Sequence, residues 1–334
     1  MKRLYIITGA NGHLGSTIIR YLRNEDCYIR GLILPTESGE DDKKLTYYRG
    51  DVTKPESLEA IFSGAECGEA IVIHTAGLIS ISEGNSQQLY KVNVEGTKNV
   101  IAQCIKHEVK RLLYVSSVHA IPEKSGSGPV TEVSHFSRNR VKGAYAVTKA
   151  MATRLVLNAA EKELDAVVVH PSGIIGPYDD GKNHLVQLIK MYISGHLPAG
   201  VKGGYDFVDV RDVAKGCISA AEKGKRGECY ILSNRYISVK ELLEDVRSIV
   251  GGRKKLCLPI GLAKAFIPFF EWIAKVSHSR PLYTKYALYT ISSGGNFSHD
   301  KATAELEYHP REFKETVRDT ILWLKEGSAV LEPA

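Results

Sequence analysis

Residues Leu4 to Gly15, LYIITGANGHLG, constrain the fold of this chain more than any other stretch. An apolar run ends at Thr8, and glycines follow at positions 9, 12 and 15 before the helix-like segment 16–23. Such glycines allow a tight bend, close approach of backbone N–H groups to a pyrophosphate, and close helix-strand packing. The positive end of the helix dipole would face the phosphates. The spacing is not GxGxxG, but the preceding strand and the following helix predict a dinucleotide site rather than a simple turn.

The rest of the chain continues this alternation of strand and helix. Up to residue 177 the pattern predicts an α/β fold, a Rossmann-type doubly wound parallel sheet, and beyond it a smaller, discontinuous C-terminal substrate lobe. We assign 1–177 with about 205–235 to the dinucleotide-binding domain, and 178–204 with about 236–330 to the substrate-binding lobe. A strand near Tyr205 and a helix over 211–223 are expected to return to the nucleotide sheet. The other expected strands are 27–34, 45–48, 70–74, 111–117, 166–170 and 228–232.

The composition suits a globular chain with a packed core, since 43% of the 334 residues are hydrophobic. A strand begins within two residues of the start, without a charged and then apolar leader, so we expect no signal peptide and a cytoplasmic location. The six cysteines are too widely spaced for a zinc or redox motif, so we expect them to be reduced and predict no metal site. Lysine and arginine exceed the acids by 44 − 38 = 6 without a dense basic run, which does not indicate nucleic acid.

The residues after the second strand normally choose between NAD and NADP. An acidic side chain there accepts hydrogen bonds from the adenosine ribose, whereas an arginine binds a 2′-phosphate. This chain has Ile33, Leu34 and Pro35 instead. The cofactor is therefore NADP or NAD, with a lean to NADP. Thr36, Ser38, Lys43 and Lys44 can meet a phosphate and Glu37 a ribose, although the pattern favours a solvated loop for each of them.

Polar or small residues follow three further strands, where ligands lie in open parallel sheets. Asp51 can reach an adenine amino group or can serve only as a turn residue. Thr75-Ala76-Gly77 would let the chain pass close beneath a cofactor. Ser116 and Ser117 end the next strand, and both hydroxyls are expected to face the site. The loop 121–139 that follows has the composition of a mobile surface connection.

Tyr145 and Lys149 lie four residues apart in a helix expected over 138–164, and therefore share one helix face. A lysine cation stabilises a phenolate, which would lower the tyrosine pKa toward neutrality and make the phenol a useful proton donor. Ser117 would donate a hydrogen bond to the same substrate oxygen. Two more YxxxK pairs, Tyr178/Lys182 and Tyr236/Lys240, lack this context, and an exposed structural pair is the alternative for Tyr145.

In this light the chain resembles the extended short-chain dehydrogenase/reductase family along nearly its whole length. The resemblance rests on motifs in the family's order: TGANGHLG from Thr8, GDV from Gly50, TAG from Thr75, NVEGT from Asn93, YVSS ending at Ser117, YAVTK from Tyr145 and HPSGIIGP from His170. It implies nicotinamide-dependent redox chemistry with Ser117, Tyr145 and Lys149 as the catalytic set. It also implies that the cofactor is bound by Gly9, Asn11, Gly12, His13, Leu14, Gly15, Asp51, Val52, Thr75, Ala76, Gly77, Asn93, Ser116, Tyr145, Lys149, Pro171 and Gly173, the last two lining the nicotinamide.

Within that family, the substrate side favours a reductase of a small-to-medium aldehyde or ketone, like dihydroflavonol reductase. Tyr205 replaces the arginine that nucleotide-sugar enzymes present to the substrate diphosphate, and loss of that cation disfavours a nucleotide-sugar epimerase or dehydratase. His119 also departs from the epimerases, and can donate a proton or be a plain loop residue. Ile79, His119 and Tyr205 are the expected substrate contacts. A dinucleotide-binding regulator without turnover is the alternative of another class.

Two expectations concern surfaces. The apolar segment 262–276 is too short to span a bilayer, so we interpret it as core or pocket wall, with membrane-surface contact as the alternative. The helical segments 86–107 and 138–164 are expected to pair in a homodimer, by analogy with similar proteins.

Overall fold

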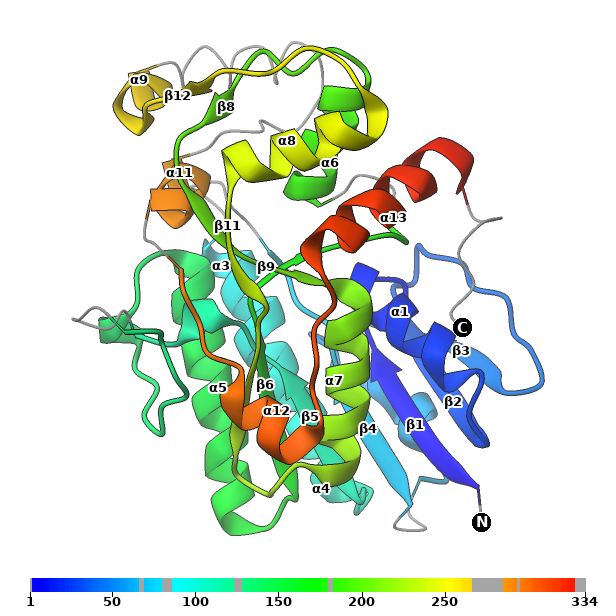
Figure 1. Cartoon of the computed structure of the whole chain (residues 1–334). Helices are drawn as coiled ribbons and strands as arrows, with labels where there is room; N and C mark the ends of the chain where they lie inside the picture. Colours follow the sequence, from blue (N-terminus) through cyan, green and yellow to red (C-terminus); the bar gives the residue numbers. More distant parts are fainter. Residues whose placement is uncertain are drawn as a thin grey trace.

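The computed structural model describes residues 2–65, 69–79, 86–122, 128–179, 183–265, 285–292 and 295–327. It has two stacked parts (Figure 1). A large sheet with helices on both faces forms the lower part in that view, and a smaller lobe of short strands and helices lies above it. The lobe is built largely from residues beyond 177.

Seven parallel strands form the large sheet, in the order β10-β6-β5-β4-β1-β2-β3. The order reverses between β1 and β4, which are hydrogen-bonded neighbours, and ligands bind at such a switch point in this fold. The predicted Rossmann-type parallel sheet is therefore confirmed. The strands are β1 (Arg3–Thr8), β2 (Cys27–Ile33), β3 (Leu45–Arg49), β4 (Ala70–His74), β5 (Arg111–Val115), β6 (Ala166–Pro171) and β10 (Cys229–Leu232).

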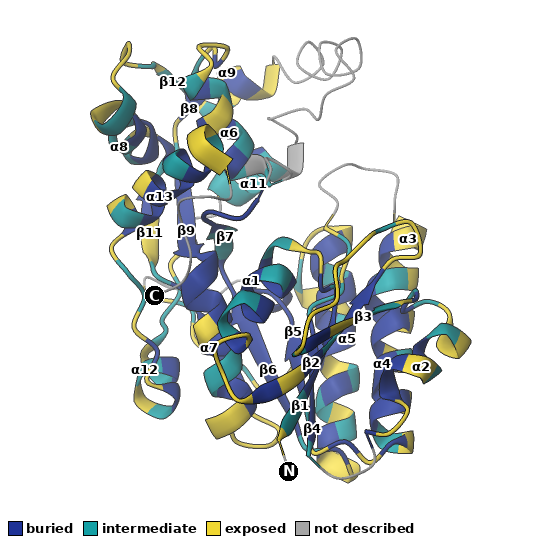
Figure 2. Cartoon of the chain, turned by 90° about the vertical axis from the view of Figure 1, so that its right-hand side faces the viewer, coloured by how far each residue is buried: buried dark blue, intermediate teal, exposed yellow. Residues whose placement is uncertain are grey.

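Alternate residues of each strand face opposite helical layers, as the period of a strand requires. On β5, Leu112 and Tyr114 pack into one apolar cluster, and Leu113 and Val115 pack into the other. The first cluster is covered by α2 (Glu59–Phe62), α4 (Gly96–Lys106) and α5 (Ala144–Lys162), and the second by α1 (His13–Leu22) and α7 (Val210–Lys223). Figure 2 shows the strands buried between these layers.

A second, three-stranded sheet joins the two parts. Its order is β11-β9-β7, with β7 at Gly173–Ile175, β9 at Gly204–Asp209 and β11 at Arg235–Ser238. The expectation that the strand at Tyr205 returns to the nucleotide sheet is therefore wrong, because β9 pairs with β7 and β11 instead. β10 does join the large sheet.

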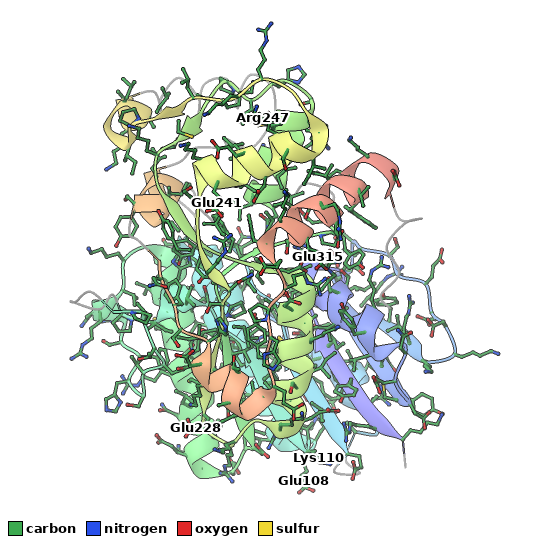
Figure 3. All side chains as sticks on the ribbon, in the orientation of Figure 1. Glu108, Lys110, Glu228, Glu241, Arg247 and Glu315 are labelled. Atoms are coloured by element: carbon green, nitrogen blue, oxygen red, sulfur yellow. The ribbon has the colours of Figure 1, made fainter. Side chains whose placement is uncertain are left out.

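The lobe is completed by a two-stranded sheet and by helices. The strands are β8 (Gly200–Val201) and β12 (Cys257–Leu258), and the helices are α6 (His184–Ile193), α8 (Val239–Val250), α9 (Ile260–Ala265), α11 (Lys285–Ser292) and α13 (Phe313–Glu326). In Figure 3, Lys110 and Glu228, which directly precede β5 and β10, lie at the end of the molecule opposite to Glu241 and Arg247 of the lobe. The carboxyl ends of the strands therefore face the lobe.

Two predicted helices differ from the observed ones. The helix expected from 138 begins at Ala144, because Gly143 has a φ of +96° that interrupts the helical backbone. Tyr145 is thus in the first turn of α5 rather than in its middle. The helix expected over 86–107 consists of α3 (Ser86–Tyr90), a π-helical turn over Lys91–Glu95, and α4.

The described part of the loop after β5, residues 128–139, lies at the surface as expected, and specific contacts hold it to the protein. Phe136 is buried and stacks on His170, with ring centroids 5.2 Å apart. Val130 donates its N–H to Asn296 at 2.8 Å. Glu132 accepts the outward N–H of Ile231 on the edge strand β10 at 2.8 Å, and Lys301 donates to the carbonyl of Cys229 on the same strand at 2.9 Å.

The apolar segment 262–276 is described only as far as Ala265, at the end of α9, and the rest lies outside the described residues. No described helix has the length and apolar character needed to cross a bilayer. The five described cysteines are free thiols, as expected, and four of them are buried.

Candidate functional site

The glycine turn between β1 and α1 is packed so closely that side chains do not fit. Gly9 has a φ of +72°, and a Cβ there would lie 2.8 Å from the Ala76 nitrogen. A Cβ on Gly15 would lie 2.2 Å from the Gly9 carbonyl oxygen. Gly12 precedes the helix without a side-chain cap, which leaves the first N–H groups of α1 available to an anion. This backbone cradle fits the pyrophosphate of a dinucleotide.

The residues after β4 are tied to this turn and to α5. Thr75 donates its hydroxyl to the Thr8 carbonyl at 2.7 Å. Asn93 accepts the N–H of Leu78 at 2.8 Å, and its amide donates to the Leu78 carbonyl at 3.0 Å and to the Thr148 hydroxyl at 3.1 Å. Asn93 lies in the π-helical turn, a feature that often marks functional positions. The predicted TAG segment and Asn93 are therefore brought together beside α5.

Ser117 and Tyr145 meet at the carboxyl end of β5. The Ser117 hydroxyl is close enough to the Tyr145 phenol to lower its pKa, and both residues are buried, with 6% and 8% of their surfaces exposed. The Ser117 oxygen also accepts the backbone N–H of His119 at 3.2 Å. Two of the three predicted catalytic residues thus converge on one point.

The tyrosine pKa moves in the opposite direction to the one expected. Burial raises the pKa of Tyr145 to about 12, and the hydrogen bond from Ser117 offsets this only in part. The expected lowering by Lys149 is therefore not seen, because the ammonium is held elsewhere and is itself buried. Burial lowers the pKa of Lys149 to about 7.

Lys149 is anchored by β5. Its Nζ donates to the Val115 carbonyl at 2.8 Å and to the Tyr114 hydroxyl at 3.3 Å. It also lies 4.9 Å from the centre of the Tyr114 ring, within the range of a cation–π contact. A Cβ on Gly77 would lie 3.4 Å from Nζ, which places the ammonium directly against the TAG segment.

A buried chain of polar groups continues from Lys149 to the glycine turn. The Tyr114 hydroxyl is hydrogen-bonded to Thr97, and Thr97 is 3.1 Å from Nε2 of His74. Nδ1 of His74 lies 2.6 Å from the hydroxyl of Thr8, the residue before Gly9. The position of the lysine is thus linked to the base of the dinucleotide cradle. The sequence does not mark Tyr114, Thr97 and His74 as site residues, because each lies inside an apolar strand or helix pattern.

Ser116 differs from its neighbour. Its hydroxyl lies 2.7 Å from the Thr153 hydroxyl on α5, and Thr153 in turn donates to the Lys149 carbonyl. The expectation that both serines face the site is wrong for Ser116, because successive strand residues point to opposite sides. Its side chain fixes the end of β5 to α5 instead.

His119 and Tyr205 form an aromatic wall beside Tyr145. The His119 ring stacks on Tyr205 at 5.6 Å with an interplanar angle of 10°, and meets Tyr145 edge-on at 5.9 Å. Phe297 extends the wall, since its ring meets that of Tyr205 at 5.8 Å. Burial lowers the pKa of His119 to about 4, so its ring is neutral at physiological pH. Two expected substrate residues are thus adjacent, whereas Ile79 is 70% exposed at the rim.

Several predicted cofactor residues have structural partners. Asp51 accepts the N–H of Thr53 at 2.9 Å, the turn contact that the sequence had left open. Val52 packs against Gly96, where a Cβ would approach it to 2.7 Å. Asn11 donates to the Ser38 carbonyl at 3.0 Å, and His13 contacts the Pro177 carbonyl at 2.7 Å.

The remaining predicted positions lie along the edges of the site. Leu14 is buried in the first turn of α1. Pro171 ends β6, and Gly173 begins β7, where a Cβ would meet the Phe207 ring at 2.7 Å. No cluster of metal-binding side chains is present in the described parts of the chain.

Comparison with known proteins agrees with this geometry. The model of the NAD dependent epimerase/dehydratase family matches residues 5–233. The chain belongs to this family. Sterol demethylase protein B of Methylococcus capsulatus is 27% identical over 97% of this chain and 99% of its own length. The crystal structure of gox2253 is similar with a TM-score of 0.82 and 31% identity, covering 98% of this chain and 99% of that one.

The family membership makes the chain an NAD(P)-dependent oxidoreductase of the extended short-chain dehydrogenase/reductase type. UDP-glucose 4-epimerase of Thermotoga maritima, solved with UDP-glucose, shares the fold with a TM-score of 0.77 and 19% identity, covering 97% of this chain and 99% of that one. At that identity the likeness concerns the fold alone.

Proposed function

We propose that the protein reduces a carbonyl group of a small-to-medium, apolar substrate with Tyr145 as the proton donor. The observation that carries this proposal is the proximity of Ser117 to the buried Tyr145, with Lys149 anchored nearby, at the carboxyl end of β5. Bound in the glycine cradle, NADH or NADPH would supply the hydride. The dinucleotide-binding domain and the substrate lobe would keep the boundaries expected from the sequence, except that the strand at 204–209 belongs to the small sheet.

In the proposed mechanism the Tyr145 hydroxyl donates its proton to the substrate carbonyl oxygen. With its pKa raised to about 12, the phenol is protonated at neutral pH and ready to donate. The Ser117 hydroxyl stabilises the charge that develops on the same oxygen, since its own oxygen is oriented by the His119 N–H. Lys149 would hold the nicotinamide ribose from its position against Gly77. Asn93 fixes the segment between them.

The wall of His119, Tyr205 and Phe297 supports an apolar, ring-bearing substrate. Flat rings stack well on aromatic side chains. An uncharged histidine also has a small desolvation cost when an apolar group packs against it. A sugar diphosphate would instead require a cation, and the position of that arginine holds Tyr205. The relative named sterol demethylase protein B supports a substrate of this kind.

The proposal is tested by mixing the purified protein with NADH or NADPH and a panel of aldehydes, flavonoid ketones and steroid ketones. Loss of absorbance at 340 nm with a ring-bearing ketone is expected. Saturable binding of UDP-glucose or dTDP-glucose would favour the epimerase alternative. Tight cofactor binding without turnover of any compound would favour a regulator.

Substitution of the proton donor tests the assigned role. Tyr145→Phe should lower kcat by about 10²- to 10⁴-fold, the usual contribution of a positioned acid, while the cofactor Kd stays within about twofold. Tyr236→Phe is the matched control, because Tyr236 belongs to another YxxxK pair and is 41% exposed in the lobe. Full activity of Tyr145→Phe would remove Tyr145 from the mechanism.

We also propose a cytoplasmic homodimer that pairs through α4 and α5. The free thiols of the described cysteines fit a reducing compartment. Light scattering after size-exclusion chromatography tests the assembly, and a monomeric mass at micromolar concentration would contradict it.

A further inference from the structure

The backbone carbonyl of Ser117 is held from two directions. It accepts the N–H of Ala120 at 3.0 Å, within the short turn that begins after Ser117. It also lies 3.0 Å from Nδ1 of His170 on β6. Because β6 pairs with β5, this second contact comes from the neighbouring strand of the large sheet. A histidine of β6 thus holds the backbone of the residue that is proposed to stabilise the substrate oxygen.

The surroundings of His170 decide which of its nitrogens carries a proton. The residue is completely buried, with 0% of its surface exposed, and burial lowers its pKa to about 4. The ring is therefore neutral at physiological pH and has one N–H and one acceptor nitrogen. A carbonyl oxygen can only accept a hydrogen bond, so the proton lies on Nδ1, which donates to Ser117.

Packing keeps the ring in this orientation. The Phe136 ring stacks on it at 5.2 Å with an interplanar angle of 8°. Among the described residues, Nε2 of His170 has no hydrogen-bond partner. An apolar side chain in this strand would avoid the cost of burying an imidazole, so the hydrogen bond to Ser117 is the contact that an apolar residue could not make.

We propose that His170 is a positioning residue for the reaction, because its Nδ1–H holds the Ser117 carbonyl and so orients the Ser117 hydroxyl toward the substrate oxygen. This role rests on the proposed function, since it acts through Ser117. The same turn carries His119 of the aromatic wall, whose backbone N–H donates to the Ser117 hydroxyl oxygen at 3.2 Å. A shift of the carbonyl would therefore move the hydroxyl and the wall together, and misplacement by about 1 Å can cost about 100-fold in rate.

Two substitutions separate the hydrogen bond from the packing. His170→Leu fills the space without a donor, and should lower kcat about tenfold while KM and the cofactor Kd stay within about twofold. His170→Asn carries its amide nitrogen on Cγ, the atom that bears Nδ1 in histidine, and should restore kcat to within about threefold of the native value. Steady-state rates of the full chain with NADH or NADPH and a flavanone or a steroid ketone measure both variants. Equal losses of kcat in the two variants would overturn the proposal.

A double-mutant cycle with Ser117→Ala shows whether His170 acts through Ser117. If it does, His170→Leu should lower kcat by less than about twofold once the Ser117 hydroxyl is absent. A residue that only fills space would cost the same factor in both backgrounds, and that result would overturn the proposal.

The matched control is His107→Leu. His107 is another buried histidine, and its ring lies 5.8 Å from that of Phe62 after the end of α4. Its loss should lower the thermal stability and leave kcat within about twofold. An equal fall of kcat in His107→Leu and His170→Leu would show a general effect of core substitution and refute the positioning role.

A measurement without turnover checks the hydrogen bond itself. Nitrogen NMR shifts of the histidine rings in the full chain should show a neutral His170 with its proton on Nδ1, assigned by the signal that is lost in His170→Asn. A proton on Nε2 would overturn the proposal. Native kcat in His170→Leu together with a loss in Ser117→Ala would refute the role of His170 alone. Full activity of Ser117→Ala would instead refute the proposed role of Ser117, and this one with it.

Discussion

The glycine turn and the aromatic wall are built in opposite ways. The turn is a continuous stretch from Gly9 to Gly15, and its conformation follows from glycines that leave no room for Cβ atoms. The wall of His119, Tyr205 and Phe297 brings together a loop after β5, a strand of the small sheet and a segment far along the chain. The proposed cofactor site is thus formed by residues close together in the sequence, whereas the proposed substrate surface depends on packing of residues far apart in the sequence.

Buried histidines in both regions predict that acid destabilises the folded chain. Burial lowers the pKa of His74 to about 3, and those of His119 and His170 to about 4. Between pH 6.5 and 4 the unfolded chain binds protons that the folded chain cannot, so stability falls as the pH falls. Asp206 on β9 opposes this, since burial raises its pKa to about 6 and the folded state then binds a proton earlier.

Summed over these four groups, the free energy of unfolding should be about 4 kcal/mol lower at pH 5 than at pH 7. Urea titrations at both values measure the loss. Asp206→Asn should enlarge it by about 1 kcal/mol. An unchanged free energy of unfolding between pH 7 and pH 5 would show that the buried histidines can be protonated in the folded state.

The connection between the two parts can be broken at a buried ion pair. Arg211, at the start of α7, contacts Asp209 at 2.8 Å and Asp319 of α13 at 2.7 Å. Asp319→Ala should lower the free energy of unfolding by about 3 kcal/mol, the low end for a broken buried pair, because Asp209 still neutralises Arg211. Glu69→Ala breaks an exposed pair with Lys110 and should cost less than about 1 kcal/mol. Equal losses in chemical denaturation would mean that burial of the pair is unimportant.

One added methyl group tests whether the short glycine turn alone determines cofactor binding. Gly15→Ala places a Cβ against the Gly9 carbonyl and must displace the turn, so the NADH Kd should rise about 100-fold, equivalent to about 2.7 kcal/mol. Gly261→Ala in α9 of the lobe is the control, since nothing lies within 4 Å of its added Cβ. An unchanged Kd in Gly15→Ala would show that dinucleotides do not bind at this turn.

The smallest effect is expected from the chain that links Lys149 to the turn. Tyr114→Phe removes one hydrogen bond to Nζ but keeps the ring, so kcat should fall about tenfold or less, near 1 kcal/mol. If Tyr114 acts by positioning Lys149, the pH dependence of kcat should also shift, whereas a purely structural role would change only stability. Tyr90→Phe, on exposed α3, should alter neither quantity.

The sequence predicted the large sheet, the glycine turn and the proximity of Ser117 to Tyr145, because strand period and motif order are local signals. It did not predict that Tyr114 accepts a hydrogen bond from Lys149, because a tyrosine in an apolar strand pattern is normally interpreted as a core residue. The strand at Tyr205 was placed in the wrong sheet because its pairing with β7 and β11 depends on residues distant in the chain. The start of α5 was missed because the positive φ of Gly143 is not visible in a helical pattern.

The outer edge of β10 has a consequence for self-association. Its N–H at Ile231 and its carbonyl at Cys229 are already occupied by the side chains of Glu132 and Lys301. These two backbone groups are therefore not available to an incoming strand, which disfavours pairing of another chain along this part of the edge. A chain that added a strand to this border would first have to displace the side chains of Glu132 and Lys301.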